Sequence, residues 1–130
     1  AAGAEVAVFN RTTARARQLA AELGVRATER LEPADIVVNA TSLGLQADSD
    51  PFKELPGLAD TFGAGSFVAD MVYGAGNALL LATARSRGAD VVDGLEILVA
   101  QGAASLERWT GRPAPHDVMR RAVEAPDRPQ

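Results

Sequence analysis

Cysteine is absent from this sequence, and histidine and lysine occur once each, as His116 and Lys53. Without cysteine the chain can form neither a disulfide nor a thiolate metal site, and a single histidine cannot form a metal-binding cluster. The 13 basic residues are scattered along a chain whose net charge is -4 at pH 7. Nucleic acid surfaces concentrate Lys and Arg. We therefore expect neither a metal nor a nucleic acid partner, and a small molecule is favoured instead.

Long apolar runs and targeting signals are absent as well. The longest apolar stretch, around residues 78–84, is far shorter than the roughly 20 residues that span a bilayer. The N-terminus has no basic-then-apolar signal pattern. We expect no membrane partner and a cytoplasmic location.

The chain has the length and composition of one globular domain, with 130 residues of which 47% are hydrophobic. We expect the body of this domain to span residues 1–111, and residues 112–130 to add a C-terminal helix and a frayed tail. Residues 1–5 resemble the end of a helix and its turn. This pattern predicts that the chain is cut from a longer protein.

Strand and helix patterns alternate along the sequence. Strands are expected at residues 5–9, 25–28, 36–39, 67–72 and 89–92, helices at 14–23, 78–87, 95–109 and 113–123, and a long loop at 43–65. The run at 36–39 is apolar almost throughout, which is typical of a strand covered on both faces. Together these elements predict an α/β fold with a doubly wound, mostly parallel sheet.

The first helix has a clear apolar face. Ala16, Leu19, Ala20 and Leu23 recur at helical spacing, and Gly24 follows as a C-terminal cap. This spacing places the four side chains on one face of the helix. Gly88 is expected to end the helix at 78–87 in the same way.

Polar residues and glycine follow several strands, where ligands bind in open parallel sheets. Four segments qualify and should line one crevice, namely Asn10-Arg11-Thr12, Asn39-Ala40-Thr41-Ser42, Met71-Val72-Tyr73 and Asp93-Gly94. In dinucleotide folds an acidic residue after the second strand would favour NAD. Here Arg11 and Arg15 could share the first turn of a helix, and their mutual repulsion favours an anion such as a 2'-phosphate. Alternatively, Thr12 or Thr13 caps the helix and both arginines are solvated.

Several other features have equally ordinary explanations. Gly74-Ala75-Gly76 resembles the start of a dinucleotide glycine fingerprint, but Leu79 replaces the third glycine, which favours a simple turn. The segment at 39–42 could contact a ribose or close a turn. Tyr73 could pack half-buried, and Gln101 could bond to a loop. His116 and Lys53 are expected at the surface.

Taken together, five segments resemble the shikimate dehydrogenase family in order and spacing. They are Val8-Phe9-Asn10-Arg11-Thr12, Val38-Asn39-Ala40-Thr41-Ser42-Leu43-Gly44, Asp70-Met71-Val72-Tyr73, Val92-Asp93-Gly94-Leu95 and Leu98-Val99-Ala100-Gln101-Gly102-Ala103-Ala104. The resemblance implies a partial NADP-binding domain of Rossmann-like fold, acting in the reduction of 3-dehydroshikimate to shikimate by NADPH on the pathway to aromatic amino acids.

The resemblance also implies roles for individual residues. Asn10, Arg11, Thr12 and Arg15 would hold the adenosine 2'-phosphate, Asn39, Ala40 and Thr41 would contact the cofactor, Met71 and Gly94 would lie against the nicotinamide, and Tyr73 and Gln101 would reach the substrate. A glycine at position 94 would let the backbone approach a flat ring closely.

Other parts of the family pattern lie outside this sequence. The first strand, its glycine-rich loop and the Lys/Asp pair for proton transfer would lie upstream, so no catalytic residue is expected here and the chain alone should be inactive. Loss of a central strand would leave unpaired sheet edges. Glu96 and Asn77-Ala78 depart from the family pattern. A relative that uses quinate, or a non-catalytic dinucleotide-binding module, therefore stays open, as does a homodimer of the full-length protein.

Overall fold

The computed structural model describes residues 3–46, 48–73 and 78–124. In chain order its elements are β1 (Ala7–Val8), α1 (Thr13–Leu23), β2 (Arg26–Ala27), β3 (Ile36–Asn39), α2 (Pro51–Glu54), η1 (Leu58–Thr61), β4 (Phe67–Asp70), α3 (Ala78–Ser86), β5 (Asp90–Val92), α4 (Gly94–Thr110) and α5 (His116–Glu124). The alternation of strands and helices confirms the predicted α/β class.

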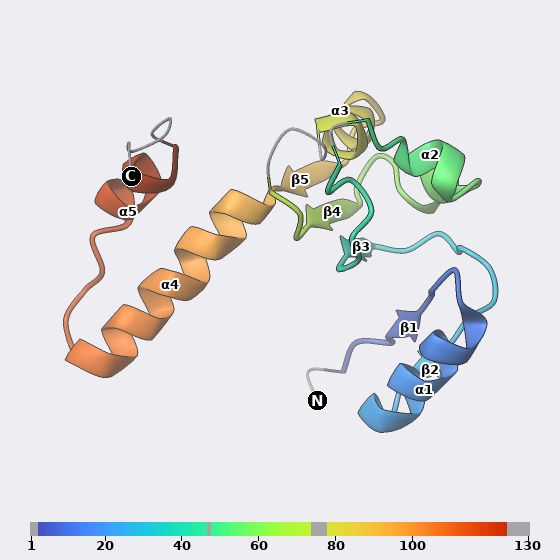
Figure 1. The fold of residues 1–130 in the computed structure, drawn as a ribbon, viewed down its shortest axis with the longest axis horizontal. Helices are drawn as coiled ribbons and strands as arrows, with labels where there is room; N and C mark the ends of the chain where they lie inside the picture. Colours follow the sequence, from blue (N-terminus) through green and yellow to red (C-terminus); the bar gives the residue numbers. More distant parts are fainter. Residues whose placement is uncertain (1–2, 47, 74–77, 125–130) are drawn as a thin grey trace.

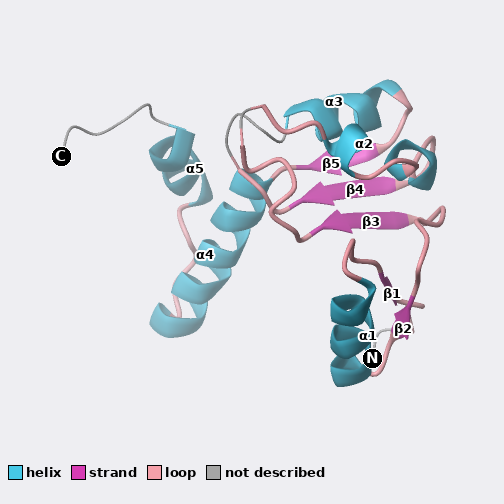
Figure 2. Cartoon of the chain, turned by 45° about the vertical axis from the view of Figure 1, so that its right-hand side comes forward, coloured by secondary structure: helices cyan, strands magenta, loops and turns pink. Residues whose placement is uncertain are grey.

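Every strand pair in the described residues is parallel, but the strands form two sheets. One sheet contains β1 and β2, and the other has the order β3-β4-β5. Figures 1 and 2 show the first pair with its helix α1 as a separate layer beside β3. This division agrees with the break expected in the middle of the sheet.

The main core lies between the three-stranded sheet and the segments that cover one of its faces. Val68 at the centre of β4 is fully buried and belongs to one cluster with Leu80 and Ala84 of α3 and Leu58 and Phe62 around η1. Helix α3 packs against β4 and β5, whereas α4 extends away from the sheet and packs against α5 (Figures 1 and 2).

The other face of β3 is open, which contradicts the prediction of a strand covered on both faces. Ile36 is 64% exposed and Val38 is 54% exposed, while Val37 between them packs against the core. Side chains alternate between the faces of a strand. Only the Val37 side meets the helical layer, so an apolar sequence here does not imply two covering layers.

Helix α1 buries only part of its apolar face. Ala16 and Ala20 are buried, but Leu19 is 45% exposed and Leu23 is 62% exposed. The helix packs against β1 and β2, which contain only two residues each and cannot cover a wide apolar face. The predicted glycine caps are correct, since both Gly24 and Gly88 adopt positive φ after their helices.

The segment at 43–65 is not the uninterrupted loop that the sequence suggested, because it contains α2 and η1. Asp50 is the N-cap of α2, and its side chain accepts hydrogen bonds from the backbone N–H groups of Phe52 (3.0 Å) and Lys53 (3.2 Å). Pro51 occupies the first helical position, which suits proline. This Asp-Pro pair is a helix-start signal that the sequence analysis did not use.

Candidate functional site

The carboxyl ends of β3 and β4 meet at one edge of the three-stranded sheet, because the strands are parallel and in register. Asn39, the last residue of β3, lies opposite Asp70, the last residue of β4. Helix α4 begins at Gly94, shortly after β5. The structure thus gathers the segments at 39–42, 71–73 and 93–94 at this edge, while the segment at 10–12 follows β1 in the other sheet.

The segment after β1 forms a compact turn at the start of α1. The side-chain oxygen Oδ1 of Asn10 accepts a hydrogen bond from the Thr12 N–H (2.8 Å). Thr12 occupies the N-cap position, and its carbonyl accepts from the Arg15 N–H (2.9 Å), but its side chain makes no capping hydrogen bond. Asn10 therefore fixes the entry to the helix.

The two arginines of this segment lie on the surface at the start of α1. The first turn of α1 contains no acidic side chain. Arg11 Nη1 lies 3.8 Å from Glu54 Oε2, with the Arg11 side chain 77% exposed. An exposed pair at this distance contributes little. A helix N-terminus adds its own amide donors and dipole, so this position favours an incoming anion.

Asn39 organises the turn after β3. Its Oδ1 accepts hydrogen bonds from the Thr41 N–H (3.1 Å) and the Thr41 hydroxyl (2.7 Å), and its Nδ2 donates to the Leu43 carbonyl (2.9 Å). The Thr41 hydroxyl in turn accepts from the Leu43 N–H (3.0 Å). Asn39 is 9% exposed, whereas Ala40 and Thr41 are exposed. The buried Asn39 amide thus closes the turn, and Ala40 and Thr41 remain on the surface.

Asp70 was missed by the sequence analysis as a site residue of its own. Its side chain is 1% exposed, and its Oδ1 accepts from Asn39 Nδ2 and from the Val72 N–H, both at 3.0 Å. Burial raises the pKa of the Asp70 carboxyl above its usual value, against the opposing effect of these two bonds. Its partners could not be read from the sequence, since Asn39 lies 31 residues away.

Gly94 is required by a backbone contact. A Cβ at this position would lie 2.7 Å from the Val72 carbonyl oxygen and 2.8 Å from that of Met71. Real Cβ atoms do not approach backbone this closely. Asp93 is the N-cap of α4, and its Oδ1 accepts from the Glu96 N–H (2.8 Å). The start of α4 is therefore held tightly against the segment that follows β4.

The two residues expected to reach the substrate are both exposed, but only one lies at the strand ends. Tyr73 is 58% exposed, so a large part of its side chain is open to solvent. Met71 beside it is 47% exposed. Gln101 lies on α4, seven residues after Gly94, which is about 10 Å further along the helix axis. Gln101 is exposed and lies about two helical turns beyond the start of α4.

Lys53 and His116 both lie at the surface, as predicted. Lys53 Nζ pairs with Asp50 Oδ2 (3.1 Å) and is 85% exposed. His116 is exposed and borders a cavity of about 170 Å³ between α4 and α5. The segment Gly74-Ala75-Gly76 lies outside the described residues.

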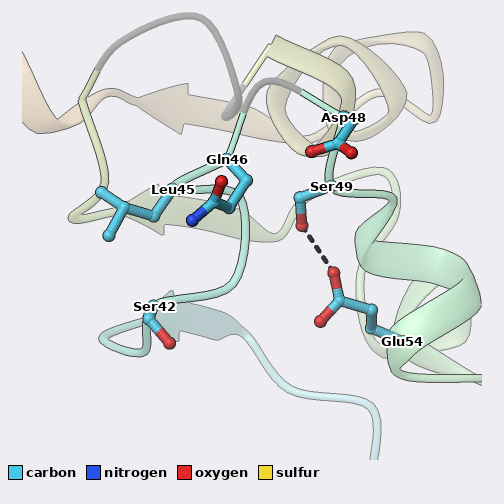
Figure 3. Close-up of a pocket in the computed structure, with 6 residues that line it drawn as sticks. All are labelled: Ser42, Leu45, Gln46, Asp48, Ser49 and Glu54. Atoms are coloured by element: carbon cyan, nitrogen blue, oxygen red, sulfur yellow. Dashed lines mark hydrogen bonds between the residues drawn. The ribbon is translucent and has the colours of Figure 1, made fainter.

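A second cavity, of about 350 Å³, lies beside the turn after β3. It is lined by Ser42, Leu45, Gln46, Asp48, Ser49 and Glu54 (Figure 3). One Glu54 oxygen accepts a hydrogen bond from the Ser49 hydroxyl (2.6 Å), and the other faces Arg11. Glu54 thus connects this cavity to the first segment, a link that the sequence analysis missed because it treated 43–65 as one loop.

The described residues contain neither a membrane-spanning helix nor a group of metal ligands. None of their helices is both long enough and apolar enough to cross a membrane. No three of their His, Asp and Glu side chains are grouped so as to hold a metal ion.

Comparisons with known proteins agree on one family. The sequence profile of the shikimate 5'-dehydrogenase C-terminal domain matches residues 94–124. The shikimate dehydrogenase (NADP(+)) of Paracoccus denitrificans is 41% identical over 93% of this chain and 45% of its own length.

Solved structures show the same relationship. The shikimate 5-dehydrogenase of Thermus thermophilus in complex with NADP(H) and shikimate has a TM-score of 0.78 and 37% identity, over 95% of this chain and 46% of its own. A quinate dehydrogenase from Corynebacterium glutamicum in complex with NAD has a TM-score of 0.72 and 25% identity, over 92% of this chain and 46% of its own. The chain thus spans about half the length of the relatives that it matches. In sequence and in fold the chain is thus similar to the corresponding part of shikimate dehydrogenases, and the profile of their C-terminal domain matches it at 94–124.

Proposed function

We propose that this chain is the NADP-binding part of a shikimate dehydrogenase. Such an enzyme reduces 3-dehydroshikimate to shikimate and oxidises NADPH to NADP, on the pathway to aromatic amino acids. The observation that carries the proposal is the start of α1, where Arg11 and Arg15 are exposed and the first turn lacks an acidic side chain. The NADP(H) bound by the Thermus thermophilus relative supports it.

The residues at the start of α1 fit a 2'-phosphate. Two guanidinium groups supply charged donors, and the turn held by Asn10 presents the first backbone amides of the helix. Charge-assisted hydrogen bonds from Arg to phosphate contribute about 1.5–3 kcal/mol each. One or two such bonds are enough to favour NADP over NAD by about tenfold or more.

Each strand-end segment has a role in this proposal. Asn39, Ala40 and Thr41 contact the cofactor, Met71 and the Gly94 backbone lie against its nicotinamide end, and Tyr73 and Gln101 bind the substrate. When bound, the cofactor would donate a hydride as NADPH in the reduction of 3-dehydroshikimate and accept one as NADP in the reverse reaction. No residue of this chain is assigned to proton transfer, which we assign to a Lys/Asp pair elsewhere in the full-length protein. The chain alone is accordingly inactive.

The organisation of the protein follows from the same proposal. Residues 1–111 form a partial NADP-binding domain, and residues 112–130 are its C-terminal helix and tail. A cytoplasmic location and a homodimer of the full-length protein complete the proposal.

A second candidate is a dehydrogenase that uses quinate. The similarity to the Corynebacterium glutamicum quinate dehydrogenase favours it. With the full-length protein, the ratio of initial rates for shikimate and quinate oxidation separates the two candidates.

The cofactor assignment is tested by calorimetric titration of the 130-residue chain with 2',5'-ADP and with 5'-AMP, which differ by the 2'-phosphate. The chain should bind 2',5'-ADP about tenfold more tightly. Arg11→Ala and Arg15→Ala should each reduce this preference. Arg17→Ala is the matched control, because Arg17 lies on the same helix and pairs with Glu29.

Equal binding of the two nucleotides would contradict the proposed 2'-phosphate site. So would an Arg17→Ala variant that loses as much preference as the other two variants, since general charge would then explain the binding.

A further inference from the structure

The buried carboxylate of Asp70 is poorly explained by stability alone. Its side chain is 1% exposed, and Oδ2 has no hydrogen-bond partner in the described structure. Burying a charged group with an unsatisfied oxygen is unfavourable, and an apolar side chain of similar size is often tolerated at such a place.

The Oδ1 atom of Asp70 connects two strand-end segments. It accepts one hydrogen bond from Asn39 Nδ2, at the end of β3, and one from the Val72 N–H, just after β4. Val72 and Met71 are the residues whose carbonyls contact Gly94. One acceptor atom thus lies between the turn that contains Thr41 and the backbone against which α4 begins.

Asp70 and the Leu43 carbonyl together hold the orientation of the Asn39 amide, since both accept from its Nδ2. An amide carries donors on its nitrogen and an acceptor on its oxygen. Asp70 Oδ1 is an acceptor, so it can form a hydrogen bond only with the nitrogen of the Asn39 amide. With Nδ2 directed at Asp70, the Asn39 Oδ1 is left to accept from both the Thr41 N–H and the Thr41 hydroxyl. If the amide were reversed, it would present donors to the Thr41 N–H and lose that bond.

We propose that Asp70 is a positioning residue for the cofactor: it orients the Asn39 amide, and thereby the Thr41 turn, and it fixes the Met71-Val72 backbone beside Gly94. This inference rests on the proposed function, because it assumes that these segments contact NADP. Asp70 itself touches neither cofactor nor substrate in this scheme.

The test compares three variants of the 130-residue chain. Asp70→Val removes the acceptor and leaves an apolar side chain of similar size. Asp70→Asn keeps an oxygen that accepts from Asn39 and Val72. Ser66→Ala is the matched control, because Ser66 is also buried and hydrogen-bonded but precedes β4 at its opposite end.

Three quantities are measured for each variant, namely the melting temperature, the affinity for NADP and the exchange rates of the Thr41 and Leu43 amides. Asp70→Val should bind NADP about tenfold more weakly, since small displacements of positioned groups are costly. It should also melt below the wild type, because the Asn39 and Val72 donors lose their acceptor. Its Thr41 and Leu43 amides should exchange faster. Asp70→Asn should retain affinity within about threefold, and Ser66→Ala should change only the melting temperature.

The inference and the proposed function fail in different ways. If the wild type binds NADP and Asp70→Val binds it equally well, or if Asp70→Asn loses as much affinity as Asp70→Val, the positioning role is wrong and the proposed function stands. If the full-length wild type binds neither NADP nor 2',5'-ADP, both are overturned. Should Asp70→Val not melt cooperatively, Asp70→Ala is measured in its place with the same outcomes.

Discussion

Gly94 and Val72 are in backbone contact: a Cβ on Gly94 would lie 2.7 Å from the Val72 carbonyl oxygen and 2.8 Å from its carbonyl carbon. The first residue of α4 and the segment after β4 are therefore packed as closely as two backbones allow. The sequence resemblance explained this glycine by its approach to a flat ring. The structure adds a second reason, which operates whether or not a cofactor is bound.

Gly94→Ala is expected to destabilise the chain by about 1–3 kcal/mol, because the new methyl group meets backbone that must shift. Thermal denaturation followed by circular dichroism measures the effect. Gly102→Ala in the same helix is the control, since its Cβ would meet only the flexible end of Met119, at 3.2 Å. An equal loss of stability in both variants would show that the contact with Val72 is not the cause.

Glu54→Gln is expected to strengthen binding of 2',5'-ADP by up to about fivefold, because Arg11 loses a competing carboxylate and exposed pairs contribute up to about 1 kcal/mol. Binding of 5'-AMP should not change. The gain should decrease with added salt, which screens exposed charges. Glu22→Gln alters the net charge by the same amount at a distant position of α1, and a comparable gain in that variant would refute the role of Glu54.

Glu32 is expected to stabilise the folded chain more at a pH above the normal pKa of glutamate than at a pH below it. Bonds from Arg26 and Thr28 lower the Glu32 pKa from 4.5 to about 2. A lowered pKa in the folded state adds stability that is fully present above pH 4.5 and is lost as the pH falls toward 2. The melting temperature of the wild type should therefore fall more steeply from pH 6 to pH 3 than that of Glu32→Gln, with pH values chosen to span roughly this window. Arg26→Met should flatten the profile in the same way, and an unaltered slope in both variants would contradict the assignment.

The pH dependence of stability that Asp70 contributes is expected to have the opposite sign to that of Glu32. Burial raises its pKa in the folded state, so the folded chain holds this proton more tightly than the unfolded chain does. Its contribution to stability is present below the unfolded pKa and is lost as the pH rises through the folded pKa. In Asp70→Asn this loss should disappear, and the melting temperature measured from acid to neutral pH should fall less than in the wild type. A steeper fall in the variant would mean that the ionised carboxylate stabilises the fold.

Local signals in the sequence predicted the elements and several of their ends. Gly24 and Gly88 mark helix ends because a residue with positive φ is needed there. The apolar run at 36–39 was correctly identified as a strand. Its two exposed side chains, Ile36 and Val38, were not predicted, because burial depends on which layers cover the strand rather than on the strand itself.

The site was predictable at the level of segments but not of contacts. Parallel strands bring their carboxyl ends together, so all four segments were expected to line one crevice. Segments 39–42, 71–73 and 93–94 are neighbours, whereas 10–12 follows β1 in the other sheet. The pairing of Asn39 with Asp70 depends on the register of β3 against β4, and the link from Arg11 to Glu54 joins residues 43 positions apart. No local pattern encodes either contact.

The open edge of β3 has a consequence for how this chain behaves in concentrated solution. In the described part of the chain β3 pairs with β4 alone, and Ile36 and Val38 stand exposed beside the free edge. A free edge of this kind is a template for a strand from another molecule. Self-association through β3 links folding to mass action, so the apparent stability of the chain is expected to rise with its own concentration.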